Sequence, residues 1–295
     1  MNRLKSTICF LLLLLLTVGC VDAPSRQQEA VIPVPSAESV EIAVVEDTIV
    51  QSLTPLPVPT VPPTPTPSPT PEPTPTPEPT PTPEPTKDPN RKMVALTFDD
   101  GPNPDFTPLV LDVLEEYHVK ATFFVVGTRL NEASKPMMQR MADLGMDIGM
   151  HGLNHTRMTK YSVSTNVQRF EKMRQKISDQ IEGGYITHIL RPPYGSTSKN
   201  VRKACKQAEV ASFRWSIDTL DWKTKNTKKI VNTVKAKVED GAIILFHDRL
   251  DATVNALKEL IPWLLEQGYD LVTVTELIES TGKPLEYGKD YRYKE

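Results

Sequence analysis

The sequence predicts an α/β domain in which about seven parallel strands form one sheet, open or closed into a barrel. Two observations lead to this prediction. From about Lys92 onward, short β-prone runs alternate with stretches whose apolar residues recur at helical spacing. The residue types that most often carry chemistry follow the ends of these runs, and parallel α/β folds gather functional groups at the carboxyl ends of their strands.

Apolar periodicity divides this region into alternating elements. Strands are expected at 93–98, 121–127, 147–151, 188–192, 211–217, 242–247 and 270–274. The first helix face consists of Val110, Leu111, Val113, Leu114 and Tyr117, and shorter helices are expected at 131–144, 198–208, 227–239 and 252–267. A longer helix should carry Val163, Val167, Phe170, Met173, Ile177 and Ile181. This alternation is typical of a parallel sheet.

The N-terminus has the features of an export signal. Two basic residues, Arg3 and Lys5, precede the apolar run Ile8–Leu16, which is too short to span a bilayer. The next residues, Thr17-Val18-Gly19-Cys20, resemble the lipobox of bacterial lipoproteins, although Thr17 stands where Leu is commonest. The resemblance implies that Cys20 is lipidated and anchors an exported protein to the outer face of a bacterial cytoplasmic membrane. The alternative is an ordinary secretory signal and a secreted protein.

A proline-rich linker separates this anchor from the domain. Of the 28 prolines, 16 lie between Pro55 and Pro85, and the motif PEPTPT repeats from Pro71. Such a segment cannot bury enough apolar surface to fold, and alternating proline favours polyproline II, which would reach on the order of 100 Å here. The 209 residues from Lys87 suffice for one core. The expected order is a signal at 1–19, a lipidated and disordered segment at 20–54, the linker at 55–89 and one domain at 90–295.

Charge is distributed unevenly along the chain. Residues 87–295 carry 31 Lys plus Arg against 28 Asp plus Glu, a net charge of +3, whereas residues 20–86 carry 1 against 9, or −8. Near neutrality without a long Lys/Arg run argues against nucleic acid as a partner. Cys205 is the only cysteine of the domain, so no disulfide can form within it, and its place in a predicted helix favours a core position.

Two predicted strands end in residues suited to a metal site. The first runs into Asp99-Asp100-Gly101-Pro102, which alone could also be a simple turn. Adjacent side chains at the end of an extended strand point apart, so one carboxylate could hold a metal ion and the other a proton. The third strand runs into His151-Gly152-Leu153-Asn154-His155, where histidines four residues apart share a helical face and could chelate an ion.

Three later strand ends carry further candidates. Each has a structural alternative: a rigid loop for the segment that begins at Arg191, tryptophan packing for the segment that begins at Trp215, and an ordinary satisfied polar group for His247. The functional interpretations are an arginine beside an aromatic residue, a sugar-binding wall and a general acid. The segments are Arg191-Pro192-Pro193-Tyr194-Gly195, then Trp215 with Asp218, Asp221 and Trp222, then Leu245-Phe246-His247-Asp248.

Together and in this order, these segments resemble the motifs of the polysaccharide deacetylases of carbohydrate esterase family four, the NodB-homology domain. The family motifs are TFDDGP, H-x-x-x-H, RPP-aromatic-G, D-x-x-D-W and L-x-H, and the resemblance spans about Met93 to Leu277. One departure is Gly152, where the family usually has Ser or Thr, and we expect it to leave metal binding by His151 intact. Family members form a distorted, incomplete (β/α) barrel, which is therefore the architecture expected here.

The resemblance also implies a role for each matching residue. A divalent metal ion, zinc or alternatively Co, Mn or Ni, would be held by Asp100, His151 and His155. The general base would be Asp99, kept ionised by Arg191. The remaining roles are general acid for His247, its partner for Asp221, an oxyanion donor for the backbone N–H of Tyr194, and walls around the acetyl group and sugar for Leu245, Trp215 and Trp222.

The implied function is metal-dependent removal of N-acetyl groups from N-acetylglucosamine residues of an acetylated polysaccharide. Peptidoglycan is the expected substrate, because the anchor and spacer would place the domain in the cell wall, and the chain is expected to act as a monomer. The alternatives are O-deacetylation of xylan or a similar glycan, and a non-catalytic wall-binding lipoprotein, which the intact set of ligands, base and acid disfavours. The sequence contains no G-x-S-x-G motif, which argues against a serine hydrolase.

Overall fold

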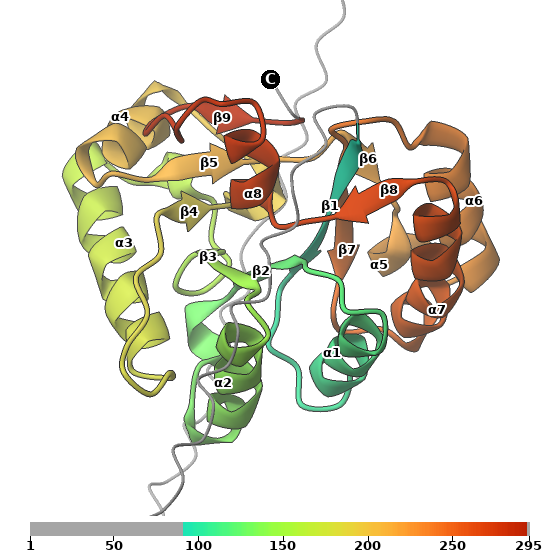
Figure 1. Cartoon of the computed structure of the whole chain (residues 1–295). Coiled ribbons are helices and arrows are strands. Elements are labelled where there is room, and N and C mark those ends of the chain that lie inside the picture. The colour runs from blue at the N-terminus through green and yellow to red at the C-terminus, as the bar shows by residue number, and fades with distance from the viewer. Residues whose placement is uncertain (1–90, 294–295) are drawn as a thin grey trace, which may run out of the picture. The chain divides into compact units, whose positions relative to one another are not determined.

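Nine parallel strands form the sheet at the centre of the structure, a computed structural model that describes residues 91–293 (Figure 1). Their order is β6-β7-β1-β2-β3-β4-β5-β9, and β8 also pairs with β1. The strands are β1 (Lys92–Asp99), β2 (Thr122–Val125), β3 (Asp147–Met150), β4 (Ile189–Leu190), β5 (Ala211–Phe213), β6 (Ile217–Asp218), β7 (Ile243–His247), β8 (Tyr269–Leu271) and β9 (Asp290–Tyr291).

Helices cover the sheet and connect its strands, with α3 and α4 at one end and α6 and α7 at the other (Figure 1). They are α1 (Thr107–Glu116), α2 (Lys135–Asp143), α3 (Val163–Ser178), α4 (Lys199–Gln207), α5 (Asp221–Thr224), α6 (Thr227–Lys237), α7 (Asp251–Glu266) and α8 (Val274–Glu279). Four short 3-10 helices are η1 (Gly127–Arg129), η2 (Glu132–Ser134), η3 (Met158–Lys160) and η4 (Pro193–Gly195). No helix within residues 91–293 is long and apolar enough to cross a membrane.

The central strand β1 explains why the site lies where it does. It pairs with β2 and β7 on either side, and it is buried from Val94 to Asp99. Phe98 stacks on Phe123 of β2 and Phe246 of β7, with ring centroids 5.0 and 5.7 Å apart. Because β1 and β7 are parallel and in register, Asp99 stands opposite His247 at the same edge of the sheet.

The predicted distorted, incomplete (β/α) barrel is confirmed, with one correction to its strands. The strand expected at 211–217 is two strands, β5 and β6, separated by residues 214–216. The first pairs with β4 and the second with β7, so the chain leaves one part of the sheet and joins another within this segment. Strands β6 and β9 end the strand order without pairing to each other, which leaves the barrel open.

Other element boundaries also differ from the expected ones. The helix predicted at 131–144 begins with η2 and becomes α-helical only at Lys135, and α3 ends at Ser178, before Ile181. The elements that were not predicted are α5, α8, β9 near the C-terminus and the 3-10 helices η1, η3 and η4. Cys205 is buried on α4 and free, as expected. The predicted signal, anchor and linker lie within residues 1–90, outside the described residues.

Candidate active site

One cavity of ≈ 590 Å³ opens at the carboxyl ends of the strands. Nine of the predicted site residues line it: Asp99, Asp100, His151, His155, Tyr194, Trp215, Trp222, Leu245 and His247. Two others, Arg191 and Asp221, are fully buried and bonded to members of that set. Of the predicted site residues, only Cys20 lies outside the described residues.

Three ligand atoms converge on one point of this cavity. Asp100, His151 and His155 each offer one, and these atoms all lie within 4.8 Å of one another. The Oδ1 atom of Asp100 is 3.2 Å from Nε2 of His155 and 3.7 Å from Nε2 of His151. Burial alone would raise the pKa of Asp100, but its interactions with the rings of His151, His155 and His247 and with the Arg249 guanidinium outweigh burial and lower that pKa. The carboxylate is therefore held ionised, as a ligand must be.

The orientation of His151 indicates that a cation belongs at this point. Its Nδ1 is 2.8 Å from the carbonyl oxygen of Arg191 and, because a carbonyl can only accept, Nδ1 carries the proton. Burial lowers the pKa of His151, so its ring is neutral and Nε2 presents a lone pair. That lone pair faces Asp99 Oδ2 at 3.6 Å and Asp100 Oδ1 at 3.7 Å. Three acceptors facing one another are unfavourable unless a cation lies among them.

The backbone conformation at position 152 explains why Gly152 stands where the family motifs usually have Ser or Thr. Its φ is +81°, a left-handed conformation that Ser or Thr rarely adopts. The next ligand, His155, also has a positive φ, +54°, so the loop after β3 turns sharply between its two histidines. Neither value displaces a ligand atom from the cluster.

Asp99 is fixed by a buried arginine. Its Oδ1 accepts a hydrogen bond from Arg191 Nη1 at 2.8 Å, and both side chains are almost fully buried. The guanidinium also donates to Thr97 Oγ1 and to the carbonyl of Arg214, and lies 4.3 Å from the centre of the Phe124 ring. One oxygen of Asp99 is therefore occupied, and the other, Oδ2, faces the histidine cluster.

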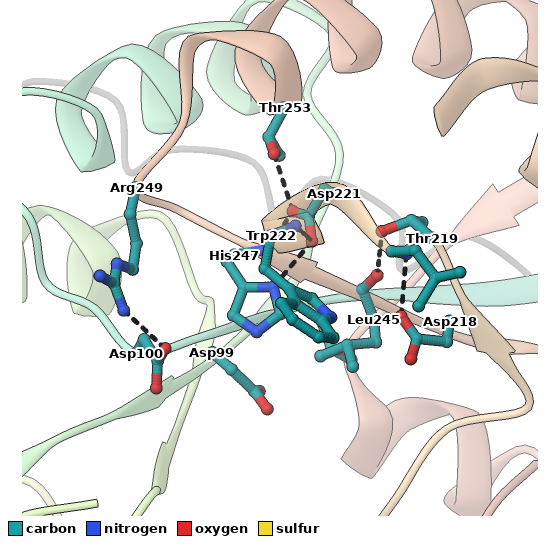
Figure 2. Close-up of polar contacts among 12 residues, drawn as sticks. Asp99, Asp100, Asp218, Thr219, Asp221, Trp222, Leu245, His247, Arg249 and Thr253 are labelled. Carbon is teal, nitrogen blue, oxygen red and sulfur yellow. Dashed lines mark hydrogen bonds and ion pairs between the residues drawn. The ribbon is translucent and has the colours of Figure 1, made fainter. Parts of the chain in front are cut away.

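His247 is held by a second buried acid (Figure 2). Its Nδ1 donates to Asp221 Oδ1 at 2.8 Å, and its backbone N–H donates to Oδ2 of the same carboxylate, which also accepts from Thr253 Oγ1. Burial alone would lower the pKa of His247, but the hydrogen bond to Asp221 and that residue's negative charge raise it. The shift therefore favours the protonated ring, and Nε2 is free to give up the proton.

Aromatic side chains form the walls of the cavity. Trp222 is 53% exposed, so it is a surface residue rather than core packing, and Trp215 is half-buried. Tyr194 is 57% exposed and has a positive φ of 62°; its ring centroid lies 4.7 Å from that of His155. Leu245, by contrast, is a buried apolar residue of the lining. This combination of exposed rings and a buried apolar side chain suits a sugar that presents a methyl group.

Four further residues line the cavity: Asp218, Lys225, Arg249 and Leu250. The sequence pattern includes Asp218 in a possible sugar-binding wall without giving it a role of its own, and it contains no indication of the other three. Arg249 Nη1 donates to Asp100 Oδ2 at 2.8 Å (Figure 2). The other oxygen of Asp100, Oδ1, is the one that lies 3.2 Å from His155 Nε2. The available signal was position, because Arg249 and Leu250 directly follow the His247-Asp248 strand end.

Asp248, next to His247, is a buried acid with an incomplete set of hydrogen bonds. Its Oδ2 accepts a hydrogen bond from Thr107 Oγ1, whereas Oδ1 has no hydrogen-bond partner among the described residues. A Cβ added to Gly101 would lie 2.2 Å from Oδ2, so only glycine fits there. Burial raises the pKa of Asp248 from 3.8 to about 6. The side chain thus packs between α1 and the loop that carries Asp100.

Replacing Asp248 with Asn is expected to flatten the dependence of stability on pH. Because the folded pKa is raised, the wild-type contribution is fully present below the unfolded value of 3.8 and is lost as pH rises through about 6. The loss amounts to at most about 3 kcal/mol. Urea unfolding in chelator at pH 4 and pH 7 measures it. Asp105→Asn, which replaces an exposed aspartate, is the matched control, and its stability should depend on pH as that of the wild type does. The same pH dependence of stability in both variants would contradict the prediction.

Comparison with known proteins identifies the family. The polysaccharide deacetylase family matches residues 86–213. A peptidoglycan-N-acetylglucosamine deacetylase of Bacillus cereus is 34% identical over 201 residues, which cover 64% of this chain and 89% of the relative. The chain belongs to the polysaccharide deacetylase family. Its NodB-type domain is therefore shared with enzymes whose names describe deacetylation of glycans.

Two other similarities are informative. The peptidoglycan-N-acetylglucosamine deacetylase PgdA of Listeria monocytogenes is 38% identical over 200 residues, which cover 68% of this chain but 41% of PgdA. The chain thus spans about two fifths of that relative's length. A solved structure of a family 4 acetyl xylan esterase from Clostridium thermocellum, in complex with a cobalt ion, is 33% identical with a TM-score of 0.64, covering 68% of this chain and 98% of the esterase.

Proposed function

We propose that this protein is a metal-dependent hydrolase that removes N-acetyl groups from N-acetylglucosamine residues of peptidoglycan. The observation that carries the proposal is the cluster of Asp100, His151 and His155, in which a neutral histidine lone pair faces two carboxylates. The cavity that contains the cluster is also lined by the proposed base Asp99, the proposed acid His247 and aromatic side chains suited to contact a sugar ring. The similarity to two peptidoglycan deacetylases supports the substrate.

A divalent ion fits the cluster, and we propose zinc, with Co, Mn or Ni able to replace it. Two imidazole nitrogens and one carboxylate oxygen suit these ions and leave coordination positions open. When bound, the ion supplies Lewis acidity to the acetyl carbonyl and lowers the pKa of water. The cobalt ion in the related esterase structure is consistent with this donor set.

Asp99 is the proposed general base, and Arg191 holds it in place. The Oδ2 atom of Asp99 accepts no hydrogen bond from residues 91–293 and faces the histidine cluster, so it can accept the proton of the attacking water. Arg191 holds Oδ1 and thereby fixes the direction of the free oxygen. The backbone N–H of Tyr194 remains our candidate donor to the oxyanion.

His247 is the proposed acid for the leaving amine. An amine is a poor leaving group until it is protonated, and His247 Nε2 is the one ring nitrogen not bonded to Asp221. The raised pKa of His247 favours the protonated ring. One chain supplies the ligands, base and acid, so we expect the monomer to be active.

Replacing Asp221 with Asn should shift the alkaline limb of the pH–kcat profile toward lower pH and reduce kcat. The charge and hydrogen bond of Asp221 raise the pKa of His247, and activity that needs the protonated ring is lost as pH rises through that pKa. Without the charge, the loss begins at lower pH. The profile between pH 5 and 9 measures the shift, with Asp218→Asn as control because the Asp218 carboxylate accepts from the backbone N–H of Leu220, whereas His247 bonds to Asp221. An unmoved limb would contradict the assignment of His247 as acid.

The function is tested by mass spectrometry of glycans after incubation with the metal-loaded protein. Peptidoglycan, chitooligosaccharides and acetylated xylan are compared. We expect loss of N-acetyl groups from the first two, abolished by chelation and by Asp99→Asn. Deacetylation of xylan alone would favour the second candidate, an O-acetyl esterase, which the similarity to the acetyl xylan esterase supports. No product from any glycan would favour a non-catalytic wall-binding protein.

We further propose that the protein is exported and lipid-anchored through Cys20, with the catalytic domain in the cell wall. The short apolar run and the lipobox-like residues before Cys20 support this, and an ordinary secretory signal is the alternative.

Cys20→Ala is therefore expected to release active protein from membranes into the medium. The anchor would tether the enzyme without taking part in chemistry, so the rate on soluble oligosaccharide should not change. Fractionation of cells expressing either form, followed by assay of each fraction, measures both properties. Membrane association that survives the substitution would contradict lipidation at this residue.

A further inference from the structure

Two segments that flank the cavity contain no acidic residue. Residues 151–170 and 183–208 hold eight Lys and Arg and no Asp or Glu. Two of the eight have clear structural roles: Arg191 is buried against Asp99, and Arg169 bonds to Asn154. The other six are exposed: Arg157, Lys160, Lys199, Arg202, Lys203 and Lys206. These six cations are called the α4 basic face below.

Four of these cations lie on one side of α4. Lys199, Arg202, Lys203 and Lys206 follow the i, i+3, i+4, i+7 spacing, opposite the buried face of the helix. Like charges at this spacing destabilise a helix. No carboxylate within residues 91–293 forms an ion pair with any of the four. Within residues 91–293, the fold therefore exposes a repulsive basic stripe that no acidic side chain pairs with.

The α4 basic face is continuous with the mouth of the cavity. The guanidinium of Arg157 lies 4.4 Å from the centre of the Tyr194 ring, and that ring packs on His155 of the metal cluster. Arg157 leads directly into η3, which ends at Lys160 and contacts α4. A hollow of ≈ 380 Å³ between the start of α3 and α4 is lined by Val163, Lys203, Lys206 and Gln207. A chain leaving the cavity past Tyr194 would therefore meet cations.

We propose that the α4 basic face binds carboxylates of the same glycan strand whose acetyl group enters the cavity. The inference rests on the proposed function, because peptidoglycan carries carboxylates on its peptide substituents and on any lactyl group that bears no peptide, whereas chitin and xylan backbones are neutral. Exposed cations attract such a strand over a distance comparable to the Debye length, and salt screens the attraction. The α4 basic face thereby favours binding of polymeric, anionic substrates, and it contains none of the catalytic groups.

The test compares two triple variants of the full, metal-loaded chain in mild detergent. One is Lys199→Gln/Lys203→Gln/Lys206→Gln. The matched control, Lys228→Gln/Lys229→Gln/Lys237→Gln, removes three lysines from α6 at the other end of the sheet (Figure 1). Binding to purified peptidoglycan freed of phosphate polymers is measured by sedimentation at low and high salt. Chitotetraose deacetylation reports on the catalytic site.

The α4 variant should bind peptidoglycan about tenfold more weakly at low salt, since each exposed ion pair contributes modestly. Its salt dependence should shrink, its chitotetraose kcat should stay within about twofold, and the α6 control should bind like the wild type. Wild-type binding should also fall when the peptidoglycan carboxyl groups are amidated.

Equal weakening in both variants would show a net-charge effect and overturn the proposal. Wild-type binding that is unaffected by amidation, or that needs a wall phosphate polymer, would overturn the carboxylate assignment. Absence of chitotetraose deacetylation in the wild type would instead contradict the proposed function and leave the binding result to stand by itself.

Discussion

Replacing Asp99 with Asn is expected to reduce kcat by about 10²–10⁴-fold, the contribution of a positioned general base, while bound metal is retained. The physical reason is the division of labour at the end of β1. Asp99 Oδ2 faces the cluster as the free proton acceptor, whereas Asp100 Oδ1 belongs to the cluster itself. Asn preserves the shape of the side chain and its bond with Arg191 through the amide oxygen, but it cannot take a proton. Metal content by elemental analysis and kcat on chitotetraose measure the two effects.

His155→Ala is the companion variant and should lose both metal and activity. His155 supplies one of three ligand atoms, and nothing else in residues 91–293 forms a cluster of three such groups. Its fold should survive, because the side chain is only partly buried. Metal lost in Asp99→Asn and kept in Asp100→Asn would reverse the two aspartate assignments, and full activity in both would rule out the mechanism.

Replacing Arg191 with Met is expected to destabilise the domain by about 3–5 kcal/mol, the typical cost of leaving one buried partner of an ion pair uncompensated. Arg191 has no exposed surface, and its guanidinium binds Asp99, Thr97 and the carbonyl of Arg214. Met fills similar volume but leaves the Asp99 carboxylate without its cation. Urea unfolding of metal-free protein at pH 7 measures the change.

Two controls make this result specific. Arg202→Met removes an exposed arginine from α4 and should change stability by no more than about 0.5 kcal/mol. The double variant Arg191→Met/Asp99→Leu removes both charges and should recover part of the loss. If the double variant were less stable than Arg191→Met alone, the cost would come from packing rather than from the unpaired charge.

Much of the candidate site follows from local sequence. Asp99, Asp100, His151, Arg191 and His247 each close a short apolar run, and the carboxyl ends of parallel strands meet at one edge of a sheet. That rule needs no long-range information beyond strand direction. It explains why residues far apart in the chain can be grouped from their positions in the sequence.

The sequence did not predict the break at residues 214–216 or the strand β9. Residues 211–217 form one β-prone run, and the break arises because β5 and β6 pair with different partners. Strand β9 has two residues, too few for any periodicity, and forms because β5 offers it an edge. Both features depend on which strands become neighbours, and local propensity does not encode this.

By itself, the sequence determined the parallel α/β class, the order of the strand ends and the residue types gathered there, because these depend on spacing along the chain. Only the tertiary structure decided how those groups are charged and aimed. Arg249 meets Asp100 across 149 residues, and Asp221 holds His247 across 26. Burial depth and partner geometry set the protonation of His247 and Asp248, and both are properties of packing that no local pattern records.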